Sequence, residues 1–91
     1  MKLNYQKVST SYGATIDGDY YRFGWYDSGK AFIARETELL SYAEAWRKFV
    51  PKRVYTINNS FYVGQTRYDK NMSGIIHYLI DKYCKQEGGE K

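Results

Sequence analysis

The sequence predicts an α+β fold: an antiparallel sheet of four to five strands with two helices on one face, in the order β-β-β-α-β-β-α. Three observations support this prediction. Alternating aromatic residues follow Asp17-Gly18, a pair typical of two-residue hairpin turns. A capping box opens a helical pattern at Ser41. A second strand–turn–strand pattern then leads into another helical stripe. The length suits one domain, which we expect over residues 1–86, with a frayed tail at 87–91.

The first three strands are predicted from alternation and turns. Residues 2–8 alternate weakly and form a candidate first strand, and residues 15–16 lead into the Asp17-Gly18 turn. The outgoing strand covers residues 20–26. Its alternation separates a core face (Tyr21, Phe23 and Trp25) from an opposite face (Tyr20, Arg22, Gly24 and Tyr26). After a turn at 27–30, residues 31–35 form a third strand.

The first helix is predicted from both of its ends. In Ser41-Tyr42-Ala43-Glu44 the serine oxygen can accept from the Glu44 N–H, and the glutamate can reach back to the serine N–H. Pro51 ends the helix near residue 49. The apolar face follows helical spacing and consists of Tyr42, Ala45, Trp46 and Phe49.

The second half repeats the pattern. Residues 54–57 form a strand, Asn58-Asn59 a tight turn, and residues 61–68 one partner strand. Either Asp69 or Asn71 caps a final helix. Its apolar stripe consists of Met72, Ile75, Ile76, Leu79, Ile80 and Tyr83.

Catalytic and metal-binding chemistry is not predicted. His77 is the only histidine and Cys84 the only cysteine, and their spacing is two helical turns, about 10 Å of rise. No zinc spacing and no phosphate-binding glycine loop occurs. We therefore expect no enzyme activity, no cofactor and no metal. The sequence shows neither a signal peptide nor a membrane span, so a cytoplasmic location and no membrane partner are expected.

The positive charge is concentrated in the second half. Residues 1–46 hold five basic and six acidic side chains, for a net charge of −1, whereas residues 47–91 hold nine and four, for +5. Arg47, Lys48, Lys52 and Arg53 flank Pro51, and Arg67 and Lys70 join them if the second hairpin folds back. Such a cluster suits phosphates. It equally suits a solvated helix end, where cations complement the dipole.

The tyrosines predict a second contact surface. Eleven tyrosines cannot all fit in a core of this size, so several must be exposed. The strand face that carries Tyr20, Arg22 and Tyr26 combines aromatic and cationic side chains. This combination stacks on nucleic-acid bases or anchors protein interfaces.

Residues 19–50 resemble the AP2-like arm-binding domain of phage and transposon tyrosine integrases. The similar stretches are Tyr20-Tyr21-Arg22-Phe23, Asp27-Ser28-Gly29-Lys30 and Ala43-Glu44-Ala45-Trp46. The resemblance implies a three-stranded sheet on a helix, with Arg22, Lys30 and Arg35 facing DNA. The chain departs from the family at residues 31–35. The family's third strand is rich in lysine and arginine, whereas this segment has one basic residue, Arg35. In general style, the chain also resembles small phage accessory proteins, including anti-CRISPR inhibitors.

Two functions are therefore expected. The first is a non-enzymatic module that binds nucleic acid or a nucleoprotein complex. The alternative is a phage-encoded inhibitor that blocks a host defence complex by protein contact. The sequence leaves the oligomeric state open. The candidate binding residues are Arg47, Lys48, Lys52, Arg53, Arg67, Lys70, Tyr20, Arg22 and Tyr26.

Overall fold

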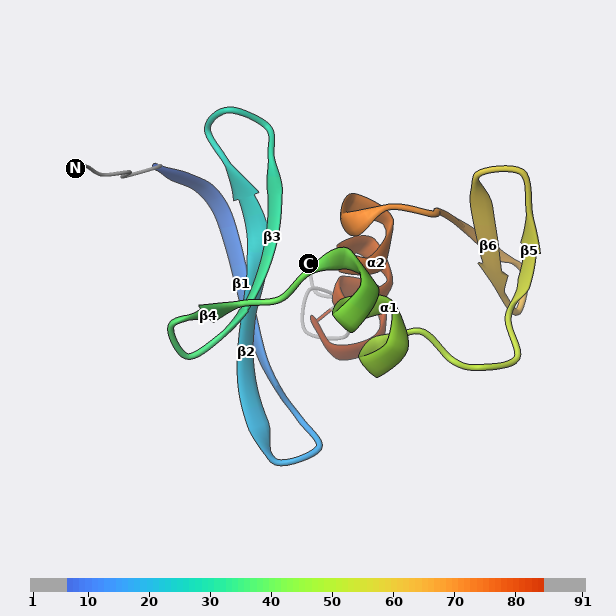
Figure 1. Ribbon diagram of the computed structural model, residues 1–91, viewed down its shortest axis with the longest axis horizontal. Coiled ribbons are helices and arrows are strands. Elements are labelled where there is room, and N and C mark those ends of the chain that lie inside the picture. Colours follow the sequence, from blue (N-terminus) through green and yellow to red (C-terminus); the bar gives the residue numbers. More distant parts are fainter. Residues whose placement is uncertain (1–6, 85–91) are drawn as a thin grey trace.

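The strands form two antiparallel sheets with the helices between them, in a computed structural model that describes residues 7–84 (Figure 1). The larger sheet contains, in sequence order, β1 (Val8–Ile16), β2 (Asp19–Tyr26), β3 (Ala31–Arg35) and β4 (Glu38–Leu39). The smaller sheet contains β5 (Tyr55–Ile57), β6 (Ser60–Val63) and β7 (Thr66–Asp69). The helical elements are α1 (Tyr42–Phe49), α2 (Met72–Leu79) and a π-helical extension, η1 (Ile80–Cys84).

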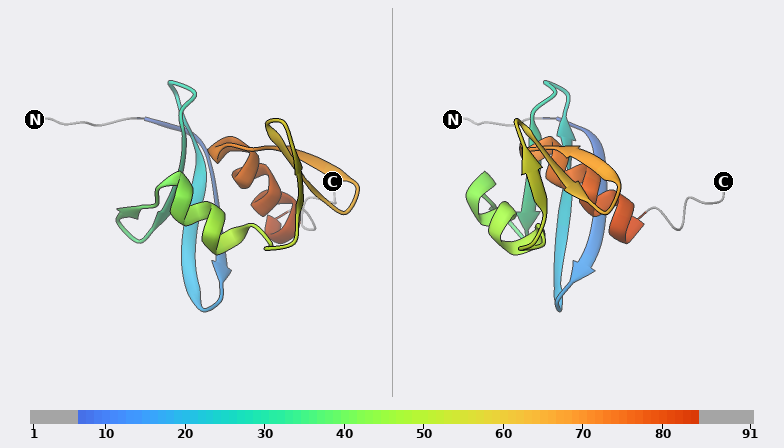
Figure 2. Two further views of the ribbon diagram at one scale, coloured as in Figure 1. Left: turned by 45° about the vertical axis from the view of Figure 1, so that its right-hand side comes forward. Right: turned by 90° about the vertical axis from the view of Figure 1, so that its right-hand side faces the viewer.

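The α+β class and the predicted order of strands and helices are confirmed, and both helices lie on one side of the larger sheet. The strands differ from the prediction in forming two sheets rather than one of four to five strands. The smaller sheet lies on the far side of α2 from the larger sheet, as the left-hand view of Figure 2 shows. Because α2 packs against β3 on one side and β7 on the other, the sheets cannot join edge to edge. None of the helices within residues 7–84 has the length and apolar character needed to cross a bilayer.

Two strands differ from the prediction within the described residues. The strand that pairs with β2 across the Asp17-Gly18 turn is β1, which continues from Val8 to Ile16, whereas only residues 15–16 were expected to lead into that turn. The strand predicted over 61–68 is two strands, β6 and β7. Gly64 adopts a positive φ of 63° between them and reverses the chain. The expectations for residues 2–6 and for the tail at 87–91 lie outside the described residues.

The larger sheet has the two faces that alternation predicts. Tyr21, Phe23 and Ile33 are buried in the core, and Tyr21 packs edge-on against Phe49 of α1. Tyr20 and Arg22 are exposed on the opposite face. Both central turn residues have positive φ, 54° for Asp17 and 90° for Gly18, as a hairpin turn of this kind requires.

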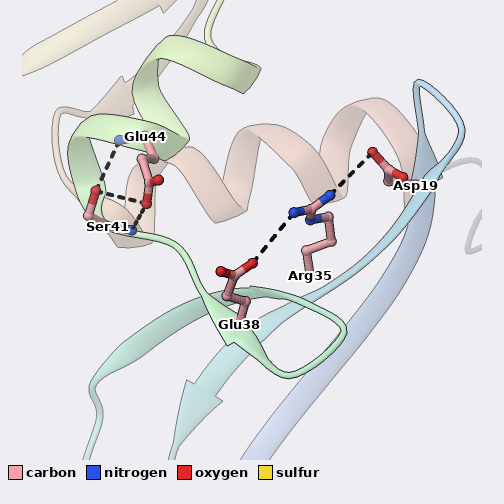
Figure 3. Close-up of polar contacts among 5 residues, drawn as sticks. All are labelled: Asp19, Arg35, Glu38, Ser41 and Glu44. Carbon is pink, nitrogen blue, oxygen red and sulfur yellow. Dashed lines mark hydrogen bonds and ion pairs between the residues drawn. The ribbon is translucent and has the colours of Figure 1, made fainter.

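Local caps fix both helices. The Ser41 Oγ accepts from the Glu44 N–H at 3.2 Å, and the Glu44 carboxylate accepts from the Ser41 N–H at 3.0 Å, so the predicted capping box is confirmed (Figure 3). Of the two candidate caps for α2, Asn71 is the one used, accepting from the Gly74 N–H at 2.8 Å. Because the cap fixes where α1 begins, it also fixes the positions of Trp46 and of the basic residues in the last turn of the helix.

A single core runs through all three layers. Ile75, Ile76 and Leu79 of α2 have no exposed surface. On the smaller-sheet side, Phe61 contacts Tyr68, Tyr78 and Trp46. On the larger-sheet side, the Trp25 Nε1–H donates to the Ser73 Oγ at 3.2 Å. The helix α2 therefore positions both sheets.

Candidate functional site

Three of the predicted basic residues converge on Trp46. Arg47 comes from α1, Lys52 from the loop that follows it, and Lys70 from the segment between β7 and α2. Two hollows adjoin along this side of the molecule, and Trp46, Arg47 and Thr56 line both of them. Lys70 borders one of these hollows, and Lys52 borders the other. We call this continuous depression the Trp46 groove.

The floor of the Trp46 groove is largely apolar. The hollow at the Lys70 end has a volume of about 520 Å³ and includes Tyr42 and Ala43. The hollow at the Lys52 end has about 480 Å³ and includes Val50, Pro51 and Val54. Volumes of this size suit a small organic group such as a nucleobase.

Aromatic contacts fix the ring of Trp46. Its indole packs edge-on against Phe61 at 5.1 Å and lies 6.1 Å from the ring of Tyr42, with centroids as reference points. The Lys70 Nζ lies 5.9 Å from the Trp46 ring centroid, a cation–π distance. Because Tyr42 and Trp46 are four residues apart on α1, helical spacing alone brings their rings to the same side.

Hydrogen bonds hold Lys70 at the groove. Its backbone N–H donates to the Asn59 carbonyl at 2.8 Å, and its carbonyl accepts from the Tyr42 hydroxyl at 3.4 Å. Partial burial raises the pKa of Tyr42, so the hydroxyl stays protonated and able to donate. The turn between β5 and β6 thereby holds Lys70 against α1, whereas Arg67, which was expected to fold back with it, does not reach the groove.

The cations of the Trp46 groove are not neutralised by carboxylates within residues 7–84. The ion pairs of this region join Arg35 to Asp19 at 3.9 Å and to Glu38 at 3.5 Å, and Arg67 to Asp69 at 3.4 Å. Glu44 is the carboxylate within α1. Its pKa is lowered first by its hydrogen bond to the Ser41 backbone, and to a smaller extent by Arg47 and Lys48. Glu44 is thus committed to the cap, and Arg47, Lys52 and Lys70 remain available to an anionic ligand.

The other predicted basic residues lie elsewhere. Lys48 borders another hollow, against β4, which Arg35, Glu38, Glu44 and Arg47 also line. Arg53 is exposed in the loop after α1. Arg67 lies on the outer face of the smaller sheet, opposite Tyr62 and paired with Asp69.

The predicted surface of Tyr20, Arg22 and Tyr26 belongs to the outer face of the larger sheet, although Tyr26 also lines a hollow with Met72 of α2. The Arg22 guanidinium donates to the Ser11 Oγ at 2.7 Å, and Tyr26 stacks on Phe32 at 4.8 Å. Leu39, 62% exposed, lies on the same face. This surface is separate from the Trp46 groove, so the nine candidate residues do not make one site.

The residues implied by the integrase resemblance are partly engaged within the chain. Arg35 pairs with Asp19 and Glu38 (Figure 3), Arg22 is bound to Ser11, and Lys30 is exposed in the turn between β2 and β3. Sequence reasoning missed Tyr42 and Trp46 as site residues because helical spacing assigned them to the core. The adjacent Arg47 was the available signal that this side of α1 reaches solvent.

The residues with catalytic potential lie apart from the Trp46 groove. His77 packs against Trp25, with ring centroids 5.1 Å apart, on the side of α2 toward the larger sheet. Among the described residues no group of three or more His, Cys, Asp or Glu side chains could hold a metal ion. No family model, curated protein or solved structure matches this chain. The integrase resemblance therefore stays a prediction.

Proposed function

We propose that the protein is a non-enzymatic module that binds nucleic acid through the Trp46 groove. The observation that carries this proposal is the convergence of Arg47, Lys52 and Lys70, from three separate segments, on one aromatic-floored groove. Cations that neutralise phosphates release counterions and supply most of the affinity of such modules. The net charge of +4 favours the same class of partner.

Salt dependence tests the proposal. With three phosphates neutralised, affinity should fall about 15- to 40-fold between roughly 50 and 200 mM salt. Fluorescence anisotropy with random-sequence oligonucleotides, DNA and RNA, single-stranded and duplex, gives this slope. Absence of binding to all of them at the lower salt concentration would overturn the proposal.

A pair of charge-matched variants locates the site. Lys52→Gln/Lys70→Gln removes two cations of the Trp46 groove, whereas Lys7→Gln/Lys30→Gln removes two exposed cations elsewhere and leaves the same net charge. We expect the first variant to bind more weakly and to lose about two from the salt slope, roughly one per phosphate-contacting lysine. We expect the control to bind nearly as the unmodified chain does. Equal losses in both variants would mean that overall charge, and not this groove, determines binding.

A protein partner is the second candidate, and the outer face of the larger sheet favours it. Tyr20 and Leu39 are 55% and 62% exposed there, and Leu39 lines a hollow together with the stacked Tyr26 and Phe32. Exposed aromatic and aliphatic side chains of this kind anchor protein interfaces. This surface would serve an inhibitor of a host defence complex, of the type found among phage accessory proteins.

The two candidates respond to different substitutions. In a pull-down from nuclease-treated bacterial lysate, a protein partner of the sheet face should be lost with Tyr20→Ala and retained with Lys52→Gln. The same pull-down from untreated lysate is the comparison. If a partner is lost only with Lys52→Gln, or is captured from untreated but not from nuclease-treated lysate, the protein-inhibitor function is contradicted and nucleic-acid binding is favoured.

A further inference from the structure

We infer that the Trp46 groove takes single-stranded nucleic acid, with a base stacked on its exposed aromatic surface and the flanking phosphates on the cations at its borders. This inference rests on the proposed function and specifies its substrate class. Two observations support it. One is the arrangement of rings and charges in the groove, and the other is that Arg22 and Arg35 of the larger sheet already have partners within the chain.

The first step concerns the rings. Tyr42 is 39% exposed at the rim, and the indole of Trp46 lies beside it at the floor. The hollow they line is otherwise bordered by Ala43, Thr56 and the two cations Arg47 and Lys70. A largely apolar hollow with an exposed ring offers a flat, unpaired base a stacking surface without demanding a particular hydrogen-bond pattern.

The second step concerns the charges. Lys70 lies at one end of the groove, Arg47 along its middle and Lys52 at the other end. Cations placed along an apolar depression suit a flexible strand, whose phosphates follow the border while its bases turn toward the floor. The Lys70 Nζ covers the Trp46 ring at 5.9 Å and can leave it for a phosphate as a base takes its place.

The third step sets single strands against duplexes. A duplex hides the faces of its bases, so sequence-reading proteins insert an element whose polar side chains reach base edges. On the larger sheet, the face that would enter a major groove has Arg22 bound to Ser11, and the one arginine of β3, Arg35, pairs with Asp19 and Glu38. The uncommitted cations lie instead around the hollow of Trp46, into which a stacked base pair cannot enter.

The experiment compares single-stranded DNA, single-stranded RNA and duplex of about 16 nucleotides at one salt concentration. We expect single strands to bind at least about tenfold more tightly than the duplex, and the DNA and RNA arms to show which sugar is preferred. Tyr42→Leu should weaken single-strand binding roughly 5- to 150-fold, the usual effect of removing one stacking ring. Tyr42→Phe keeps the ring and loses only the 3.4 Å hydrogen bond to the Lys70 carbonyl, so it should weaken binding much less than Tyr42→Leu. Far-UV circular dichroism establishes that both variants are folded.

Trp46 itself reports contact. In a Trp25→Phe background, Trp46 is the one remaining tryptophan, and a stacked base should quench its fluorescence saturably with single strands. If duplex binds as tightly as single strands, or if Tyr42→Leu binds normally, this inference is wrong while nucleic-acid binding stands. If no oligonucleotide binds at all, the proposed function fails and this inference fails with it.

Discussion

Glycine 74 shows how one residue without a side chain sets the distance between α2 and β7. A Cβ at this position would overlap the backbone of Asp69, including its carbonyl oxygen. Alanine in a helix gains about 1 kcal/mol over glycine, but an overlap with three backbone atoms puts the overpacking cost at the upper end of its range, about 3 kcal/mol. We therefore expect Gly74→Ala to lower the free energy of unfolding by about 2 kcal/mol, measured by urea denaturation.

Gly13 provides the matched control for that substitution. A Cβ there would meet only the hydroxyl end of Tyr20, which is 55% exposed and free to rotate. We expect Gly13→Ala to change stability by less than about 1 kcal/mol. Equal effects of the two substitutions would contradict the view that contact with backbone, rather than the loss of glycine, determines the cost.

Tyr68 links the smaller sheet to the C-terminal π-helix. Its hydroxyl donates to the Asp81 carboxylate at 2.7 Å, and burial, followed by Asp81, raises the pKa of Tyr68 to about 12. The neutral form is therefore favoured in the folded state. Its contribution to stability is complete below the ordinary value of 10.0 and is lost as pH rises through 12.

This pKa gives a prediction for alkaline pH. Tyr68→Phe should be about 1.5 kcal/mol less stable than the unmodified chain at neutral pH, since it lacks a hydrogen bond to a charged group. The difference should shrink between pH 10 and pH 12, because only the unmodified chain loses this contribution there. Urea denaturation of both proteins across this range measures it. A difference that stays constant with pH would contradict the assignment.

At the scale of elements, the capping box decides whether α1 presents Trp46 and Arg47 correctly. Ser41→Ala removes the side-chain acceptor of the Glu44 N–H and should cost about 1 kcal/mol in thermal or urea unfolding. Ser28→Ala is the control, because Ser28 accepts a long 3.4 Å bond in an exposed turn and should have little effect. If the two substitutions are equivalent, the box contributes nothing to α1.

The stabilisation that the capping box provides depends on pH, because Glu44 must be ionised. The pKa of Glu44 lies below its ordinary value of 4.5, chiefly through the Ser41 backbone hydrogen bond. Its contribution is therefore complete above pH 4.5 and is lost as pH falls through the lower folded value. The difference in stability between Ser41→Ala and the unmodified chain should accordingly diminish at acidic pH.

Elements with strong local signals could be predicted from sequence. Ser41, Glu44 and Pro51 fix the bounds of α1, and Asp17-Gly18 fixes the first turn, because these signals act within a few residues. The Gly64 turn was missed because Phe61, Tyr62 and Val63 read as a continuous strand pattern with Tyr68. Which strands pair with one another depends on contacts between distant segments. Local sequence patterns therefore could not show that α2 separates two sheets.

The site was predictable to the same extent. Arg47, Lys52 and Lys70 were found by charge, since basic residues stand out in a sequence. Their convergence depends on the smaller sheet folding back, and Trp46 looked like any apolar helix position. That Arg67 pairs with Asp69, two residues along β7, shows why charge alone cannot identify the available cations.

At the scale of the molecule, α2 is shared by both sheets, and no layer has a core of its own. Ile75, Ile76 and Leu79 are buried between the larger sheet and the aromatic cluster around Phe61. A sheet of three strands is stable only when its hydrophobic face is covered, and Phe61 and Tyr68 of the smaller sheet are covered by this shared core. The chain should therefore unfold in one cooperative step.

The two tryptophans allow a test of that cooperativity. Trp25 lies on the larger sheet against Ser73 and His77, whereas Trp46 packs against Phe61 of the smaller sheet. Trp46→Phe leaves a reporter for the first side, and Trp25→Phe leaves one for the second. Within each variant, the urea midpoint from fluorescence should coincide with the midpoint from far-UV circular dichroism.

Comparing two probes inside one variant removes the stability change that each substitution brings. A fluorescence midpoint of Trp46 below the dichroism midpoint would mean that the smaller sheet opens alone. The Trp46 groove lies where α1 meets the smaller sheet, so such opening would separate Lys70 from Arg47 and abolish the arrangement of charges. Coincident midpoints would mean that the groove persists as long as the fold does, and that its affinity for a strand should follow global stability.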